Sequence, residues 1–173
     1  DTMREANGKG LVVNMGVSIN TPQQALDAIR TGSDYVQIPY NVFDRRLDRV
    51  GFFDRAKERR VTVFARSPLL QGLIIMDPAK TPAHLSQAVP HLKRFRSIAT
   101  EYGLSPLEAA FLYVNAHPGI DRIVFGVETL PQLKEILSAA TREASRSCVV
   151  ELREAFMGVE ELIVNPTLWK KEP

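Results

Sequence analysis

Short apolar runs separated by longer amphipathic stretches set the pattern of this chain. Four runs of strand length predict β-strands at residues 11–17, 35–38, 61–65 and 122–125. The runs are rich in Val and Ile and show no clean alternation of apolar and polar positions. That pattern is typical of strands covered on both faces, as in a parallel sheet.

Three of the stretches between these runs begin with the same helix-start pattern. A Ser or Thr is followed by a proline within two positions and by Gln or Glu three positions on, which predicts an N-cap with a capping box. The three N-cap positions are Thr21, Ser105 and Thr129. Further helices are expected over residues 50–59, over 84–102 with a break near Pro90, and over 143–164.

The resulting order of elements is β-α-β-α-β-α-α-β-α-α, and this alternation predicts an α/β protein with a parallel sheet. No low-complexity segment or linker divides the chain, so residues 1–173 are expected to form a single domain. The long stretch 71–82 holds two prolines and is a candidate lid over a site.

Polar residues recur where each predicted strand ends. Ser18, Gln37 and Arg66 lie at three of these ends, and Gly126 follows the fourth. Ligands of parallel α/β proteins bind at the carboxyl ends of the strands. Two of the ends lead into capped helices, whose first N–H groups can bind a phosphate. Together they indicate a phosphate-bearing cofactor across neighbouring loops.

Each of these residues also has a purely structural interpretation. Gln37 on its own is equally well explained as a buried amide that ties strands together. Ser18 fits a local turn, and Arg66 fits a surface ion pair. Ser67-Pro68 and Gly126 are ordinary turn residues. It is the recurrence at every strand end that favours a binding site.

The composition excludes several classes of protein. Of 173 residues, 45% are hydrophobic and 24% charged, with a net charge of +2, so no basic surface for nucleic acid is indicated. A single cysteine, Cys148, rules out an internal disulfide framework and fits a reducing compartment. No run is long enough for a membrane span and no signal-peptide pattern opens the chain, so a cytoplasmic location is expected.

The first ten residues have the pattern of a helix end that stops at a glycine. We expect the chain to be a fragment, a processed product or an excised domain, with Met3 as a possible annotated start.

Four segments, in order, resemble the carboxyl-terminal half of the aldo-keto reductases. They are GVSINTPQQAL, VQIPYNVFDRRL, VFARSPLLQGLI and GIDRIVFGVETLPQLKEIL, which resemble the fifth to eighth strand segments, and the closing NPTLW resembles the family's tail. The resemblance covers residues 8–169. It implies parallel (β/α) units of a TIM barrel, here a half-barrel of about four strands.

The resemblance also implies roles for individual residues. Gln37 would bind the carboxamide of the nicotinamide, with Ser18 beside it. The pyrophosphate would be bordered by Ser67 and Leu69, with Gln71 and Gly72 nearby. The adenosine end would be lined by Gly126, Thr129, Gln132 and Glu135.

Three positions depart from the family's pattern. Arg66 stands where many members have an aromatic residue that stacks on the nicotinamide, so it would lie near the phosphates instead. Glu128 stands where a serine is common, and Ile136 where an asparagine is common. A carboxylate near the adenosine ribose would repel a 2′-phosphate, which favours NADH over NADPH as cofactor. A site that has lost cofactor binding would also explain a glutamate at position 128.

The family's catalytic aspartate, tyrosine, lysine and histidine belong to the first half of the barrel, which this chain does not match. His117 is better explained as a helix cap and Tyr40 as packing or a substrate wall. Four strands do not close a barrel of eight, so unpaired edges and a bare apolar inner face are expected. A partner is therefore predicted: the amino-terminal half, a second copy of the chain that forms a pseudo-barrel, or helices that cover the edges.

These observations lead to three alternative functions. The first is the cofactor-binding half of an NAD(P)H-dependent carbonyl reductase that acts on an aldehyde, a ketone or a sugar-like carbonyl, and is inactive alone. The second is a non-catalytic half-barrel that binds a nucleotide or self-associates. The third, disfavoured by the resemblance, is a flavodoxin-like sheet with another phosphate ligand.

Overall fold

The computed structural model describes residues 2–143 and 145–169. It is an α/β structure with a four-stranded sheet in the order β1-β2-β3-β4, as the alternation predicts. The chain divides into two compact units, which we describe one at a time. The first unit comprises the residues up to Pro39 together with Arg46–Arg66 and Pro118–Ile123, and the second comprises the rest. The single domain expected from sequence stays a prediction.

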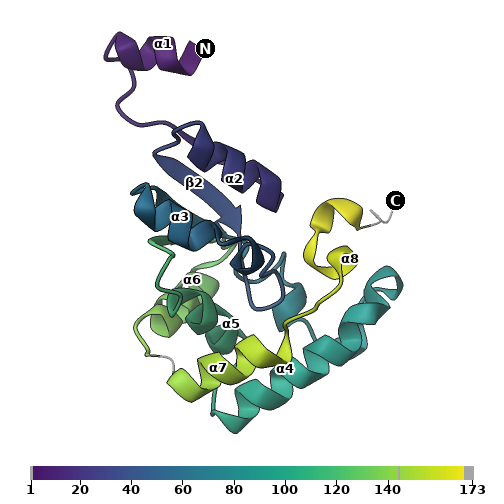
Figure 1. The fold of residues 1–173 in the computed structure, drawn as a ribbon. Coiled ribbons are helices and arrows are strands. Elements are labelled where there is room, and N and C mark those ends of the chain that lie inside the picture. Colours follow the sequence, from purple (N-terminus) through teal and green to yellow (C-terminus); the bar gives the residue numbers. More distant parts are fainter. Residues whose placement is uncertain (1, 144, 170–173) are drawn as a thin grey trace. The chain divides into compact units, whose positions relative to one another are not determined.

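The first unit holds most of the sheet and the helices that cover one of its faces (Figure 1). Its elements are α1 (Thr2–Gly8), β1 (Gly16–Ser18), α2 (Pro22–Arg30), β2 (Tyr35–Pro39), a 3-10 turn η1 (Asp48–Val50), α3 (Phe52–Glu58), β3 (Thr62–Arg66) and the start of β4 (Arg122–Val124).

The strands β1, β2 and β3 pair in parallel and in register. Side chains of β2 and β3 alternate between buried and half-buried. The buried ones belong to the core with residues of α2 and α3; they are Val36, Ile38, Val63 and Ala65. The other face of these strands, which we call the open face, carries Tyr35, Gln37, Phe64 and Arg66. Strands covered on both faces were expected. No residue of β2 or β3 is exposed, but all three residues of β1 are, so the prediction is wrong for β1.

The predicted first strand is also shorter than expected. Only Gly16–Ser18 forms β1, whereas residues 11–15 are irregular. The carbonyls of Val12 and Val13 accept hydrogen bonds from the Asn7 side chain instead of from a neighbouring strand. Val13 is 82% exposed, so no packing contact draws this apolar run into the sheet.

The second unit is mainly helical. Its elements are η2 (Leu73–Ile75), η3 (Pro78–Lys80), η4 (Ala83–Ala88), α4 (Val89–Glu101), α5 (Pro106–Asn115), α6 (Leu130–Ala140), α7 (Arg146–Ala155), α8 (Glu161–Val164) and η5 (Pro166–Leu168). Helices α4 and α7 lie side by side in Figure 1 and are in contact. The rings of Phe43, Phe95 and Phe156 pack together, with centroids 5.0 to 6.2 Å apart.

Several helix predictions fall close to the observed bounds in the second unit. The break expected near Pro90 is confirmed, since a 3-10 segment ends at Ala88 and α4 begins at Val89. The long tail helix is wrong in part, because α7 ends at Ala155 and α8 begins at Glu161. Among the described residues, no helix combines the length and the apolar character needed to cross a membrane.

All three predicted capping boxes are present. At the start of α5, Ser105 Oγ accepts from the backbone N–H of Glu108 at 3.2 Å, and the carboxylate of Glu108 accepts from the N–H of Ser105 at 2.8 Å. This backbone hydrogen bond, helped by the guanidinium of Arg142, holds the pKa of Glu108 below its usual range, although partial burial opposes the shift. The N-terminus of α5 is therefore fixed by reciprocal bonds.

We expect Ser105→Ala to lower the free energy of unfolding by about 1 kcal/mol, because an N–H at the helix start loses its acceptor. Denaturant unfolding followed by circular dichroism measures the change. Ser138→Ala is the matched control, since Ser138 is exposed in the last turn of α6, away from its N-cap. Equal stability of the two variants would contradict the role given to the capping box.

Candidate functional site

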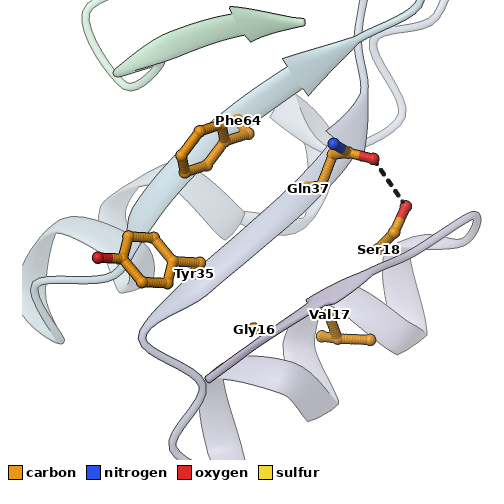
Figure 2. A pocket seen from close by; sticks show the side chains of 6 residues that line it. All are labelled: Gly16, Val17, Ser18, Tyr35, Gln37 and Phe64. Carbon is orange, nitrogen blue, oxygen red and sulfur yellow. Dashed lines mark hydrogen bonds between the residues drawn. The ribbon is translucent and has the colours of Figure 1, made fainter. Parts of the chain in front are cut away.

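The register of the strands brings Ser18 and Gln37 together on the open face. Ser18 pairs with Gln37, and Gln37 pairs with Phe64 on the next strand. Ser18 Oγ donates to Gln37 Oε1 at 3.1 Å. Because this bond engages the oxygen of the amide, both N–H donors of Gln37 Nε2 can serve a ligand. Figure 2 shows the pair with the bond between them.

A pocket of about 340 Å³ adjoins this pair, which is within the usual size of small-molecule sites. Its lining is mostly apolar, with two polar side chains, and consists of Gly16, Val17, Ser18, Tyr35, Gln37 and Phe64 (Figure 2). The rings of Tyr35 and Phe64 meet edge to face with centroids 5.8 Å apart. An apolar wall with a few fixed polar groups is the usual composition of a cofactor site.

Gly16 allows β1 to approach β2 closely at the start of this pocket. A Cβ at position 16 would lie 2.6 Å from the carbonyl oxygen of Tyr35 and 2.7 Å from its Cβ. No side chain fits there without separating the two strands. The glycine of the GVS segment is thus required by strand packing.

Arg66 ends β3 on the same open face. Its Nη2 donates to Asn20 Oδ1 at 2.6 Å and to the carbonyl oxygen of Ile19 at 3.1 Å. These two bonds hold the guanidinium against the loop between β1 and α2. Asn20 was not among the predicted site residues. The one signal in the sequence that could have pointed to Asn20 was its position between the end of β1 and the Thr21 N-cap.

The turn after β3 belongs to the second unit and has an unusual backbone. Ser67, Leu70 and Gln71 have φ angles of +60°, +49° and +53°, and Gly72 has +85°. Left-handed conformations at non-glycine residues are unfavourable and persist only where surrounding contacts fix them. Strain of this kind is common at ligand sites. Leu69 contributes its carbonyl oxygen, which accepts from Gly72 N at 3.0 Å.

Asn41 provides one contact that fixes this turn. It is fully buried, and its Nδ2 donates to the carbonyl oxygen of Ser67 at 3.1 Å. Its Oδ1 accepts from the N–H groups of Phe43 and Asp44 at 3.0 and 2.8 Å. Asn41 thereby joins the segment after β2 to the turn after β3.

The remaining predicted residues lie at the start of α6, also in the second unit. Thr129 Oγ1 accepts from the N–H of Gln132, and Gln132 Oε1 accepts from the N–H groups of Glu128 and Thr129 at 2.9 and 3.2 Å. The side-chain oxygen of Gln132 is thus engaged in the helix cap. A Cβ added at Gly126 would meet no atom within 4 Å, and the side chains of Glu128 and Glu135 are exposed.

Tyr40 is packed inside the second unit, next to the half-buried His117. Tyr40 is fully buried, its ring is nearly parallel to that of Tyr113, and the His117 ring meets it edge-on at 5.1 Å. Of the two roles expected for Tyr40, the structure shows packing. Over residues 2–143 and 145–169, no group of three or more His, Cys, Asp or Glu side chains is placed to hold a metal ion.

The predicted site residues thus form three groups. Ser18, Gln37 and Arg66 share the open face of the first unit. Ser67, Leu69, Gln71 and Gly72 form a strained turn, and Gly126, Glu128, Thr129, Gln132 and Glu135 surround the start of a capped helix, both in the second unit.

Comparison with known proteins gives two kinds of match. The sequence model of the aldo/keto reductase family matches residues 1–155. Among curated proteins, no match was found. Among solved structures, the apo form of aldo-keto reductase AKR11C1 from Bacillus halodurans superimposes with a TM-score of 0.76 at 20% identity, covering 93% of this chain and 57% of that one.

The holo form of the same Bacillus halodurans protein superimposes with a TM-score of 0.72 at 22% identity, covering 93% of this chain and 56% of the other. This chain therefore spans less than three fifths of the length of these structures. Identities this low show a shared fold, which confirms the predicted (β/α) units of a TIM barrel. Because the family match extends over most of the sequence, the chain belongs to the aldo/keto reductase family.

Proposed function

We propose that this chain is the cofactor-binding half of an NAD(P)H-dependent carbonyl reductase of the cytoplasm. When bound, the reduced nicotinamide supplies a hydride to an aldehyde, a ketone or a sugar-like carbonyl. The residues of this chain bind and orient that cofactor. A second half of the barrel brings the aspartate, tyrosine, lysine and histidine that handle the proton.

The observation that carries the proposal is the Ser18–Gln37 pair beside the apolar pocket. A nicotinamide has a flat apolar ring and one carboxamide. The wall formed by Tyr35 and Phe64 suits the ring, and the amide of Gln37 suits the carboxamide, since its Nε2 can donate to the carboxamide oxygen. The bond from Ser18 fixes which end of Gln37 faces the ligand.

The second unit supports the phosphate end of the proposal. The turn formed by Ser67, Leu69, Gln71 and Gly72 would border the pyrophosphate, in a backbone that surrounding contacts hold in a strained conformation. The start of α6 would bind the adenosine end through Gly126, Glu128, Thr129, Gln132 and Glu135. A helix N-terminus favours negative charge through its N–H groups and its dipole.

The same proposal requires a partner for the first unit. Val17 is 42% exposed on β1, which lies at the end of the strand order. An exposed apolar strand at a sheet edge pairs readily with another chain. The partner is an amino-terminal half-barrel or, where that is lacking, a second copy of this chain. The exposure of Val17 also favours the alternative function, a non-catalytic module that self-associates or binds a nucleotide.

Both NADH and NADPH are expected to bind the chain, with a rise in nicotinamide fluorescence on titration. Gln37→Leu removes the amide at similar size and is expected to weaken binding about tenfold, because a hydrogen-bonded group loses its partner. Gln23→Leu, at an exposed position of α2, is the matched control. Absence of binding by the unaltered chain would refute an intact cofactor site.

NADH is expected to bind more tightly than NADPH, because the exposed carboxylate of Glu128 would repel a 2′-phosphate. Replacing this group by Glu128→Gln should reduce the preference by about fivefold, the effect of one unit charge at about 4 Å in water. Competition titrations measure both affinities. Glu58→Gln on α3 is the control for a general change of charge. A wild-type preference for NADPH would contradict the role of Glu128.

In the absence of another half-barrel, this chain is expected to self-associate through the edge of β1. Val17→Lys should shift the assembly towards monomer, because a charge at an edge strand opposes pairing. Light scattering over a range of concentrations measures the mass. Val150→Lys is the matched control, since Val150 is 44% exposed on α7. A chain that stays monomeric throughout would argue against a second copy as partner.

A further inference from the structure

The segment that follows β2 folds around the side chain of Asn41, which is fully buried. Its Oδ1 accepts from the N–H groups of Phe43 at 3.0 Å and Asp44 at 2.8 Å. Its backbone N–H donates to the carbonyl oxygen of Asp44 at 3.3 Å. These bonds within one short segment fix the orientation of the amide, so Nδ2 is the end that serves a partner outside the segment.

That partner is the turn after β3, which belongs to the same compact unit. Nδ2 of Asn41 donates to the carbonyl oxygen of Ser67 at 3.1 Å. The same oxygen accepts from the N–H of Leu70 at 3.0 Å, a bond inside the turn. A buried donor that loses its acceptor is costly. The bond from Asn41 therefore holds the first residue of the turn in place.

The backbone of this turn is unfavourable without such contacts. Ser67, Leu70 and Gln71 have φ angles of +60°, +49° and +53°, in the left-handed region that side chains oppose. A conformation of this kind persists only where the surrounding structure enforces it. The folded protein therefore has to supply contacts along the whole turn.

The far end of the turn is fixed by packing and by an arginine. The side chains of Leu70 and Ile74 are buried. Nη2 of Arg96, on α4, donates to the carbonyl oxygen of Ile75 at 2.7 Å. These contacts lie in the later part of the turn. The near end, where the chain leaves β3, receives the bond from Asn41.

The turn also has backbone donors that serve no other group. Within the part of the chain that the structure describes, the N–H groups of Leu69 and Gln71 have no acceptor. Backbone N–H groups in a turn can form a concave site for an anion. Their directions follow from the dihedral angles of the turn, so a change at its first residue would redirect them. The conformation of the turn therefore decides how well it can receive a phosphate.

We propose that Asn41 is a positioning residue for the cofactor, because its bond to Ser67 keeps the turn in the conformation that receives the pyrophosphate before the ligand arrives. The inference rests on the proposed function, in which the pyrophosphate lies at this turn. Without the bond, the turn populates other conformations, and the ligand has to restore the strained one. The apparent affinity then falls with the fraction of molecules whose turn is already in place.

Two variants remove this bond in different ways. Asn41→Ser is uncharged, keeps an oxygen that can accept from the nearby N–H groups, and is too short to reach Ser67. Asn41→Asp keeps the size of the side chain and has no donor when ionised. Agreement between the two separates the missing bond from an added charge. Asn115→Ser is the matched control, since Asn115 is exposed at the end of α5 in the same unit.

NMR titration of the full chain measures dissociation constants for ADP-ribose, which carries the pyrophosphate, and for adenosine, which does not. In both Asn41 variants ADP-ribose is expected to bind about tenfold more weakly, the effect of one lost hydrogen bond, whereas adenosine should stay within about twofold of the unaltered chain. The amide of Leu70 should exchange with solvent about tenfold faster, because the turn opens more often. Asn115→Ser should match the unaltered chain in all three measurements.

Several results would overturn the role of Asn41 and leave the proposed function standing. They are an unchanged affinity for ADP-ribose in Asn41→Ser, an equal loss for ADP-ribose and adenosine, unchanged exchange at Leu70, and a loss confined to Asn41→Asp, which would be an effect of charge. Failure of the unaltered chain to bind both NADH and ADP-ribose overturns the proposed function, and this inference with it.

Discussion

The parallel, in-register pairing of three strands is the constraint on which the rest of this molecule depends. Because side chains alternate along a strand, the register decides at once which residues enter the core and which line the open face. Val36 and Ile38 pack inside, so Gln37 between them must face outward. A shift of one residue would bury the amide and expose the valine. Core packing therefore positions the candidate site.

Local chemistry explains why the helix starts were predictable and the strands less so. A capping box is encoded by four consecutive residues. The boxes at Thr21, Ser105 and Thr129 all form. A strand depends on a neighbour that is distant in sequence. The apolar run before β1 has none, so Val13 is exposed although its composition is typical of a strand. The number of covered faces likewise depends on packing, which composition does not specify.

The candidate site likewise has parts that the local sequence predicts and parts that depend on distant neighbours. The residue types and the resemblance they carry predicted Ser18, Gln37 and Arg66 at strand ends, and the strand register then brings them to one face. The partners that orient them were not predictable, because the bond from Arg66 to Asn20 spans 46 positions and that from Asn41 to Ser67 spans 26. Such contacts become visible only when the strands are placed side by side.

Gly16 limits how this pocket can be altered. Its hydrogen is the only substituent that the spacing between β1 and β2 admits at that position. The pocket therefore cannot be narrowed from this strand position without opening the sheet. Tyr35 and Phe64 line the same cavity with their side chains, so a change in their size alters the cavity and not the spacing of these strands. An engineer who wants a different ligand should vary these two rings and keep the glycine.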